Sequence, residues 1–405
     1  MTKTFQRDGF TWLAYLLLAF YAYYLNILGP ITPFLKEELS LSYTLSSLHF
    51  TAFAVGILIV GLAGHVVIEQ AGRWRSLWIG AAGMSLSALL LIAGKNPIVT
   101  IGASFLMGLI GSFILAIVPS ALTDQHGEQK AVALSEANVI ASLIATSAPL
   151  MVAWFAQLPG GWRMALALVA LTPFLMGLAF RKANPVKRPG AAKFSHDQQP
   201  EKRALPGLYW VYWVAIVLAV SVEFCMISWS ASYMENVLGM AKVEAARSVS
   251  VFLAAMIIGR LASSRLVAHF TTLKLVIAST LLAGGGFLIY WLASNVLLGL
   301  IGLFITGLGV ASLYPLILSL AMGSAGDRTV QASARATLAS GAAILTLPFV
   351  MGRLADAAGI RSAYGVVLLL LASVLIIVGV TTASHQIHFP VKPYHVKRTD
   401  HRRGK

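Results

Sequence analysis

Long apolar stretches separated by short polar breaks fill almost the whole chain. Twelve of them are long enough to cross a bilayer, whose hydrocarbon core of about 30 Å takes roughly 20 apolar residues as a helix. In lipid only helices and closed barrels satisfy the backbone, and these stretches are too long for barrel strands. The pattern therefore predicts an all-α membrane protein with twelve transmembrane helices.

Breaks at glycine, proline and charged residues divide the spans into two sets of six. The first set is Phe10–Leu35, Leu45–Ile68, Trp74–Ala93, Ile98–Thr123, Ala131–Leu158 and Trp162–Phe180. The second set is Leu208–Leu238, Val243–Ala268, Leu273–Ala293, Val296–Met322, Val330–Ala355 and Ala363–Thr382. We expect an N-terminal six-helix bundle (1–180), a cytoplasmic linker (181–206), a C-terminal six-helix bundle (207–383) and a basic cytoplasmic tail (384–405).

Charged residues are scarce and lie mostly on one side of the membrane. They make up only 11% of the chain, against 58% hydrophobic residues, and the net charge is +15. With these spans, 21 of the 30 Lys and Arg residues lie on the side of the N-terminus, counting those within the adjoining ends of the spans. The positive-inside rule then predicts a multi-pass protein of the cell membrane with both termini cytoplasmic. A basic face against anionic lipid accounts for the positive charge, so we expect no nucleic-acid partner.

The two halves of the chain resemble one another at matched positions. The segment Pro33–Leu41 aligns with Ser232–Met240, and spans 5 and 11 each have a Ser/Ala-rich start followed by a proline, Pro149 or Pro348. Parallel six-helix repeats of this kind place a solute site between the halves, near the membrane midplane.

The turn between spans 2 and 3 carries a glycine-rich basic motif. It reads Gly64-His65-Val66-Val67-Ile68-Glu69-Gln70-Ala71-Gly72-Arg73-Trp74-Arg75. This turn is similar to the Gly-x-x-x-Asp-Arg-x-Gly-Arg-Arg pattern of the major facilitator superfamily. It departs from that pattern by one extra residue, by Glu in place of Asp, and by Gln in place of the first Arg. The residues that match are Gly64, Glu69, Gly72, Arg73 and Arg75.

Further segments extend the resemblance over nearly all of the chain. They are Gly259–Arg265 near the inner end of span 8, Gly307-Leu308-Gly309 and Tyr314-Pro315 in span 10, and Gly352-Arg353-Leu354-Ala355-Asp356 at the end of span 11. The resemblance implies two pseudo-symmetric six-helix bundles, transport by alternating access, and a conformational role for the turn between spans 2 and 3. It does not name a substrate.

Four charged residues stand out inside the predicted spans, where each costs at least about 2.5 kcal/mol to insert. They are Glu136, Glu223, Arg260 and Arg335. Glu223 lies halfway along span 7, and we expect no fixed cation beside it. Because a lone carboxylate in lipid prefers its neutral form, we interpret Glu223 as the carrier of a coupling proton. The alternative is a carboxyl group hydrogen-bonded to a neighbouring helix.

Glu136 and Arg260 lie at similar depth in spans 5 and 8, which face each other across the halves in the superfamily. An ion pair between them would therefore form a gate when the cytoplasmic side closes. Alternatively, each side chain binds within its own half or reaches toward the interface. Arg335 occupies in span 11 the place that Glu136 has in span 5. It either meets an anionic solute or bonds carbonyl groups at the end of span 2.

Aromatic and amide side chains gather in spans 1 and 7. Tyr23, Tyr24 and Asn26 lie in span 1, and Trp229 and Tyr233 lie in span 7. Aromatic faces and polar edges suit a cavity that stacks on a solute ring, so these residues are candidates for a substrate cavity. Packing of the rings between helices without a ligand is the alternative.

These features favour a secondary active transporter that moves a small organic solute in symport with a proton. The Glu, Trp and Tyr of span 7 are similar to those of fucose and glucose permease relatives, although the acids expected in spans 1 and 4 of a fucose permease are absent. Proton-coupled efflux of drugs or metabolites is the alternative. However, span 5 has Ala145–Pro149 where drug antiporters carry a glycine-rich Gly-Pro motif. A non-transporting receptor would need a sizeable extramembrane domain, which the sequence lacks.

Motifs for other chemistry are absent from the sequence. The chain has no nucleotide-binding pattern, nucleophile elbow or zinc spacing, so we expect no enzyme activity, no cofactor and no metal. The single cysteine, Cys225, excludes an internal disulfide. We expect a monomer whose partners are the solute, a proton and anionic lipid.

Overall fold

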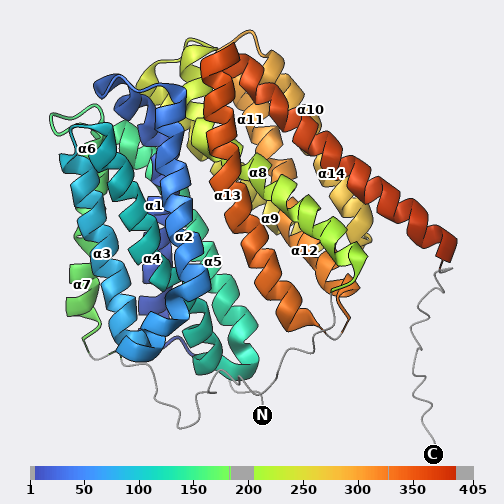
Figure 1. Ribbon diagram of the computed structural model, residues 1–405, viewed down its shortest axis with the longest axis horizontal. Helices are drawn as coiled ribbons and strands as arrows, with labels where there is room; N and C mark the ends of the chain where they lie inside the picture. The colour runs from blue at the N-terminus through green and yellow to red at the C-terminus, as the bar shows by residue number, and fades with distance from the viewer. Residues whose placement is uncertain (1–4, 182, 184–204, 327, 389–405) are drawn as a thin grey trace, which may run out of the picture.

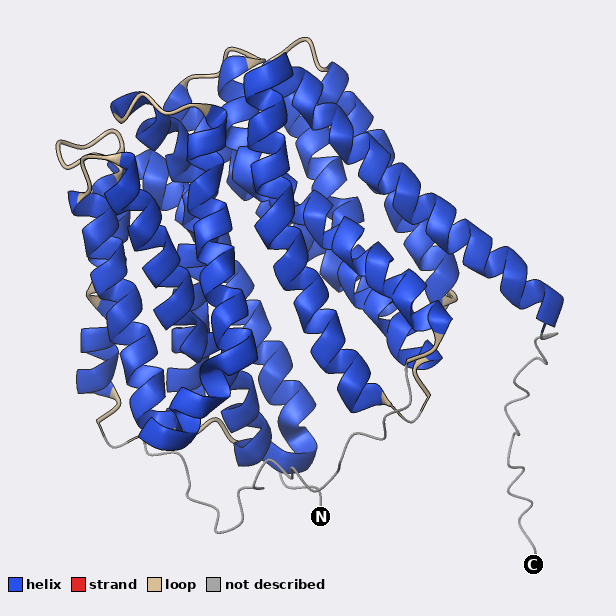
Figure 2. Cartoon of the chain, in the orientation of Figure 1, coloured by secondary structure: helices blue, strands red, loops and turns tan. Residues whose placement is uncertain are grey.

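A computed structural model describes the chain except for residues 1–4, 182, 184–204, 327 and 389–405. The described residues form helices connected by short turns, with no strand among them (Figure 2). The helices are α1 (Gly9–Glu38), α2 (Tyr43–Ala71), α3 (Arg73–Ala93), α4 (Pro97–His126), η1 (Gly127–Gln129), α5 (Lys130–Phe155), α6 (Arg163–Ala170), α7 (Thr172–Ala179), α8 (Gly207–Asn236), α9 (Lys242–Leu266), α10 (Thr272–Leu292), α11 (Val296–Val310), α12 (Leu313–Ser324), α13 (Thr329–Ala358) and α14 (Ile360–His388).

The helices confirm the predicted all-α membrane fold. Ten helical stretches of the described chain are long and apolar enough to span a membrane. One of these, Pro97–Phe155, contains both α4 and α5, and the shorter apolar stretch Arg163–Ala179 contains α6 and α7. This arrangement is consistent with the predicted spans.

Two predicted spans are each broken into a pair of helices next to a proline. Span 6 divides at Leu171, two residues before Pro173, and span 10 divides at residues 311–312, shortly before Pro315. Pro173 and Pro315 lie in the first turn of the second helix of each pair, where a missing N–H costs no hydrogen bond within the helix. Helix α14 continues to His388, and most of the predicted linker (181–206) and tail (384–405) lies outside the described residues.

The internal repeat is visible in how helices begin and in where prolines lie. Asn96 starts α4 and Asn295 starts α11, and each side-chain oxygen accepts a hydrogen bond from the backbone N–H three residues later, at 3.0 Å and 2.9 Å. This is the usual N-cap arrangement. Pro149 and Pro348 both lie inside their helices, α5 and α13. The two residues of each pair are as far apart in the sequence as Pro33 and Ser232.

The buried apolar residues form two clusters that follow the two halves of the chain. One cluster contains residues of α1 to α6 and a single residue of α9. The other contains residues of α8 to α14 and Leu205, just before α8. Within each half, glycines let helices approach closely. A side chain at Gly108 of α4 would collide with the backbone of Phe53 in α2, and one at Gly302 of α11 would collide with Tyr290 in α10.

The two halves are joined at one end of the bundle. We call the end where α1 begins and α2 meets α3 the basic end, and the other the opposite end. At the opposite end, the Asp356 carboxylate of α13 accepts hydrogen bonds from the backbone N–H groups of Tyr43 and Thr44 in α2, both at 2.8 Å. Lys242 and Glu37 form an ion pair across the halves at the same end. Figure 1 shows α2 and α13 side by side there and diverging toward the basic end. The conformation is therefore closed at the opposite end.

Candidate solute site between the two halves

A cavity of about 200 Å³ lies between the two halves, near the middle of the helices. Helices α1, α4 and α5 line one side, and α8 and α9 line the other. Toward the opposite end, Gly29 of α1 packs on the backbone of Ile227 in α8. In the same region, the Ser250 hydroxyl of α9 donates a hydrogen bond to the carbonyl group of Thr146 in α5, at 3.0 Å. These contacts close the cavity on the side of the opposite end.

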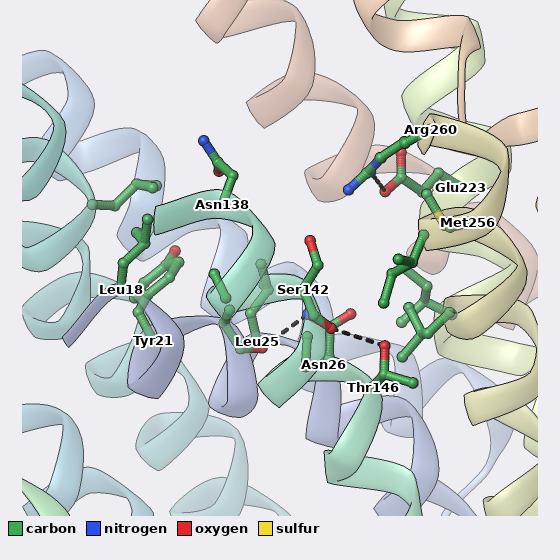
Figure 3. A pocket seen from close by; sticks show the side chains of 17 residues that line it. Leu18, Tyr21, Leu25, Asn26, Asn138, Ser142, Thr146, Glu223, Met256 and Arg260 are labelled. Carbon is green, nitrogen blue, oxygen red and sulfur yellow. Dashed lines mark hydrogen bonds and ion pairs between the residues drawn. The ribbon is translucent and has the colours of Figure 1, made fainter. Parts of the chain in front are cut away.

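The wall from the N-terminal half is polar along a single helical stripe. Asn138, Ser142 and Thr146 follow one another at four-residue spacing on α5, which places them on one face of the helix. Asn26 of α1 adds a second amide to this wall, and Figure 3 shows these side chains across the cavity from Glu223. The α5 stripe was not among the sequence candidates, although its four-residue spacing is readable in the sequence.

The wall from the C-terminal half carries the charges. The Glu223 carboxylate of α8 lies 3.4 Å from a terminal guanidinium nitrogen of Arg260 in α9 (Figure 3). The Glu223 side chain is 17% exposed and that of Arg260 45%. The expectation that no fixed cation lies beside Glu223 is therefore wrong. The two residues are far apart in sequence, and their helices adjoin only in the folded half.

Glu136 has partners within its own half in this conformation. The guanidinium group of Arg7 binds its carboxylate through two nitrogens, at 2.8 Å and 2.5 Å, and the Tyr15 hydroxyl donates to it at 3.1 Å. Arg260 contacts Glu223 instead of Glu136. The predicted pair between Glu136 and Arg260 concerns a conformation closed at the basic end. Forming it would require both residues to exchange partners.

The gate hypothesis predicts a non-additive effect of neutralising the two residues. Glu136→Gln and Arg260→Gln should each reduce closure of the basic end, whereas the double variant should do no more than the stronger single one. A cysteine in place of Asn26, on a Cys225→Ser background, reports which side of the membrane reaches the cavity through its labelling by an impermeant maleimide. Additive increases in labelling from the side of the basic end would show that the two residues act separately.

Tyr23 and Tyr24 do not line the cavity in this conformation. Both are buried, and their hydroxyl groups donate to the carbonyl groups of Ala165 and Leu166 in α6, at 2.9 Å and 2.8 Å. Of the predicted residues in span 1, only Asn26 faces the cavity, which Tyr21 of the same helix also lines. Tyr23 and Tyr24 instead attach α1 to α6 within the N-terminal half.

Trp229 and Tyr233 also lie outside the cavity. The Tyr233 ring packs against Tyr290 and Tyr364, each with ring centroids 4.7 Å away, in the interior of the C-terminal half. Trp229 is buried where the halves meet near the opposite end, with its ring centroid 5.8 Å from that of Tyr43. Both residues therefore have packing environments in this conformation.

Arg335 is exposed on α13, and its backbone carbonyl group accepts a hydrogen bond from the Trp213 indole at 2.8 Å. It does not line the cavity described above.

The glycine-rich turn lies at the basic end, between α2 and α3. Gly72 ends α2 with a φ of 82°, a conformation that side chains rarely adopt. Arg73 forms an ion pair with Asp124 near the end of α4, a partner that the motif alone did not indicate. Gly64 is buried, whereas Glu69 and Arg75 are exposed.

Comparisons with a family model and with known sequences agree on one protein family. The sequence model of the Major Facilitator Superfamily matches residues 12–346. An uncharacterized MFS-type transporter of Yersinia pestis is 29% identical over 171 residues, which are 41% of this chain and 44% of that protein. An uncharacterized transporter of Sinorhizobium fredii is 29% identical over 185 residues, or 45% of this chain and 49% of that protein. The matches span about half the length of these relatives.

Solved structures share the fold at low sequence identity. A bacterial homologue of the human lysosomal transporter Spinster has a TM-score of 0.78 at 12% identity, covering 97% of this chain and 100% of that chain. A peptide transporter in complex with sulfate has a TM-score of 0.73 at 15% identity, covering 96% of both chains. A D-xylose–proton symporter has a TM-score of 0.71 at 14% identity, covering 91% and 96%. At these identities the comparison concerns the fold alone.

Proposed function

The chain belongs to the Major Facilitator Superfamily, and on this premise we propose that it is a secondary active transporter moving a small organic solute by alternating access in symport with a proton. The solute enters the cavity between the halves, and the halves rock about it to expose it to one side of the membrane at a time. No chemical conversion of the solute is involved.

The observation that carries this proposal is the placement of Glu223. Among the described residues that line the cavity, it is the only carboxylate. It lies halfway along a membrane helix, at the boundary between the halves. A carboxyl group in this place can take up a proton from one side and release it to the other. Its contact with Arg260 makes its charge state sensitive to whatever else binds there.

Reconstitution into proteoliposomes tests the proposal. Purified protein is first screened by thermal shift against sugars, amines, carboxylates and nucleosides, because a ligand that binds only the folded state raises its melting temperature. A stabilising solute should then exchange across the vesicle membrane and enter with protons, which an internal pH dye records. A solute that leaves as protons enter would indicate antiport. Failure of every stabilising solute to cross would overturn the transporter proposal.

The proposed orientation places the basic end in the cytoplasm, following the positive-inside rule. On a Cys225→Ser background, an impermeant maleimide applied to intact cells should label a cysteine at Lys95, exposed at the opposite end. It should fail to label a cysteine at Gln70, which is exposed at the basic end. Labelling both after cell disruption controls for reactivity. The reverse pattern in intact cells would invert the orientation.

A further inference from the structure

We propose that the solute is a small organic monocarboxylate, and that its carboxylate takes the place of Glu223 on the Arg260 guanidinium group when Glu223 is protonated. The inference rests on the proposed function and names its substrate class. It follows from the geometry of the ion pair, from the charges lining the cavity, and from the polarity of the facing wall.

Arg260 is only weakly engaged by Glu223. Among the described residues, its one polar contact is 3.4 Å long, whereas charge-assisted hydrogen bonds are typically about 2.7–2.9 Å. The Arg7 group bound to Glu136 shows the fully engaged alternative in the same molecule, with two contacts at 2.8 Å and 2.5 Å. A guanidinium group has five N–H donors in a planar fork. Arg260, with its side chain 45% exposed, therefore has donors available for a second carboxylate.

The charges of the cavity favour a single negative charge on the solute. Among the described residues, its titratable or charged lining groups are Tyr21 from α1, Glu223 from α8 and Arg260 from α9, and α5 lines it with neutral side chains. Arg335 of α13 lies alongside Trp213, about 15 Å along α8 from Glu223 at 1.5 Å per residue. With Glu223 ionised, the charges of the pair cancel. Once Glu223 is protonated, one uncompensated positive charge remains, which matches a monoanion better than a dianion.

The facing wall indicates what the rest of the solute resembles. Asn138, Ser142 and Thr146 present amide and hydroxyl groups across from Arg260, and apolar side chains such as Met256 and Leu253 complete the C-terminal wall. A molecule that fits both walls has a carboxylate at one end, a short body, and hydrogen-bonding groups at the other end. The cavity volume of about 200 Å³ limits it to a small molecule.

This arrangement couples the proton to the solute. Protonation of Glu223 releases Arg260, which binds the solute carboxylate, and the loaded cavity then carries one proton and one anion. When the solute leaves, Glu223 loses its proton and returns to Arg260. Protonation of Glu223 frees the Arg260 guanidinium group for the anion, and the bound anion in turn favours protonated Glu223. Binding of the anion should therefore strengthen as pH falls, down to the range where the solute itself becomes neutral.

The test uses acids and their neutral amides as matched probes. Lactate, gluconate, nicotinate and benzoate are compared with lactamide, gluconamide, nicotinamide and benzamide by thermal shift and isothermal calorimetry at about pH 6 and about pH 8. At least one acid should bind, with at least about tenfold higher affinity at the lower pH, and its amide should not, since loss of a charged hydrogen bond costs about tenfold or more.

Four variants separate the proposed role from a structural one. Arg260→Gln should abolish binding of the acid, and Arg260→Lys should weaken it, because Lys keeps the charge and loses the planar fork. Arg265→Gln is the matched control, since Arg265 is exposed on the same helix outside the cavity. Glu223→Gln, which leaves Arg260 unengaged, should bind the acid with similar affinity at both pH values. This gain at high pH cannot arise from misfolding.

Several outcomes would overturn the inference. They are equal binding of acid and amide, retention of acid binding in Arg260→Gln, a pH dependence that persists in Glu223→Gln, and a lack of response to all four acids. If a sugar or an amine is instead exchanged across proteoliposomes, the transporter proposal stands and the substrate class alone is wrong.

Discussion

Glu223→Gln should abolish proton-driven accumulation of the solute while preserving its exchange across the membrane. Glutamine keeps the shape and the hydrogen-bonding capacity of the protonated side chain, but it cannot release a proton. In proteoliposomes with an imposed pH gradient, the internal concentration should fall from severalfold above the external one to about equal to it, since a proton gradient of one pH unit is worth about 1.4 kcal/mol. Counterflow of labelled solute without a gradient should continue.

The matched control for this variant is Glu136→Gln, which removes a carboxylate already held by Arg7 and Tyr15. It should retain proton-driven accumulation, even where its rate is lower. If Glu223→Gln still concentrates solute in response to the gradient, Glu223 is a structural group. If only Glu136→Gln loses accumulation while its counterflow continues, the coupling site lies at the basic end, whereas loss of both activities would reflect the gate.

The spans and the repeat could be predicted from the sequence because their causes are local. Apolar length sets each membrane helix, and an asparagine at the same offset in each half, Asn96 or Asn295, sets a helix start. These features depend on a few neighbouring residues and not on how the helices pack. The breaks near Pro173 and Pro315 were not predicted, because proline alone does not distinguish them from Pro149 and Pro348, which lie inside unbroken helices.

The faces of the helices were harder to predict because α1 is enclosed on most sides. Of its most apolar 18-residue window, 72% is buried, so no lipid-facing stripe marks which side meets the cavity. Tyr24 and Asn26 are both plausible lining residues by composition. Packing against α6 turned Tyr24 inward and left Asn26 facing the cavity. On α5, by contrast, polar residues at four-residue spacing distinguish the cavity face directly.

The pairing of charges could not be predicted, since it depends on which helices adjoin and on which conformation is present. Glu223 and Arg260 meet because α8 and α9 pack within one half. The depth argument that placed Glu136 opposite Arg260 considered only a conformation closed at the basic end. A sequence pattern does not show that a charged residue exchanges its partner between two conformations.

Asp356→Ala should open the opposite end. In the described conformation, this carboxylate of α13 accepts hydrogen bonds from the backbone N–H groups of Tyr43 and Thr44 at the start of α2. It acts as a helix cap supplied by the other half, so the bonds exist only while the opposite end is closed. Loss of an N-cap costs about 1 kcal/mol, which is about a fivefold shift in the ratio of the two conformations. Asp356→Asn, which keeps one acceptor oxygen, should give an intermediate shift.

The Asn26→Cys reporter on the Cys225→Ser background measures this shift in membranes of known sidedness. For Asp356→Ala, labelling by an impermeant maleimide should rise about fivefold from the side of the opposite end and fall from the side of the basic end. Glu244→Ala is the control, because Glu244 lies near the same end but pairs with Arg247 on its own helix. Unchanged labelling in Asp356→Ala, or an equal change in Glu244→Ala, would show that closure depends on the apolar contacts between α2 and α13 and not on the shared cap.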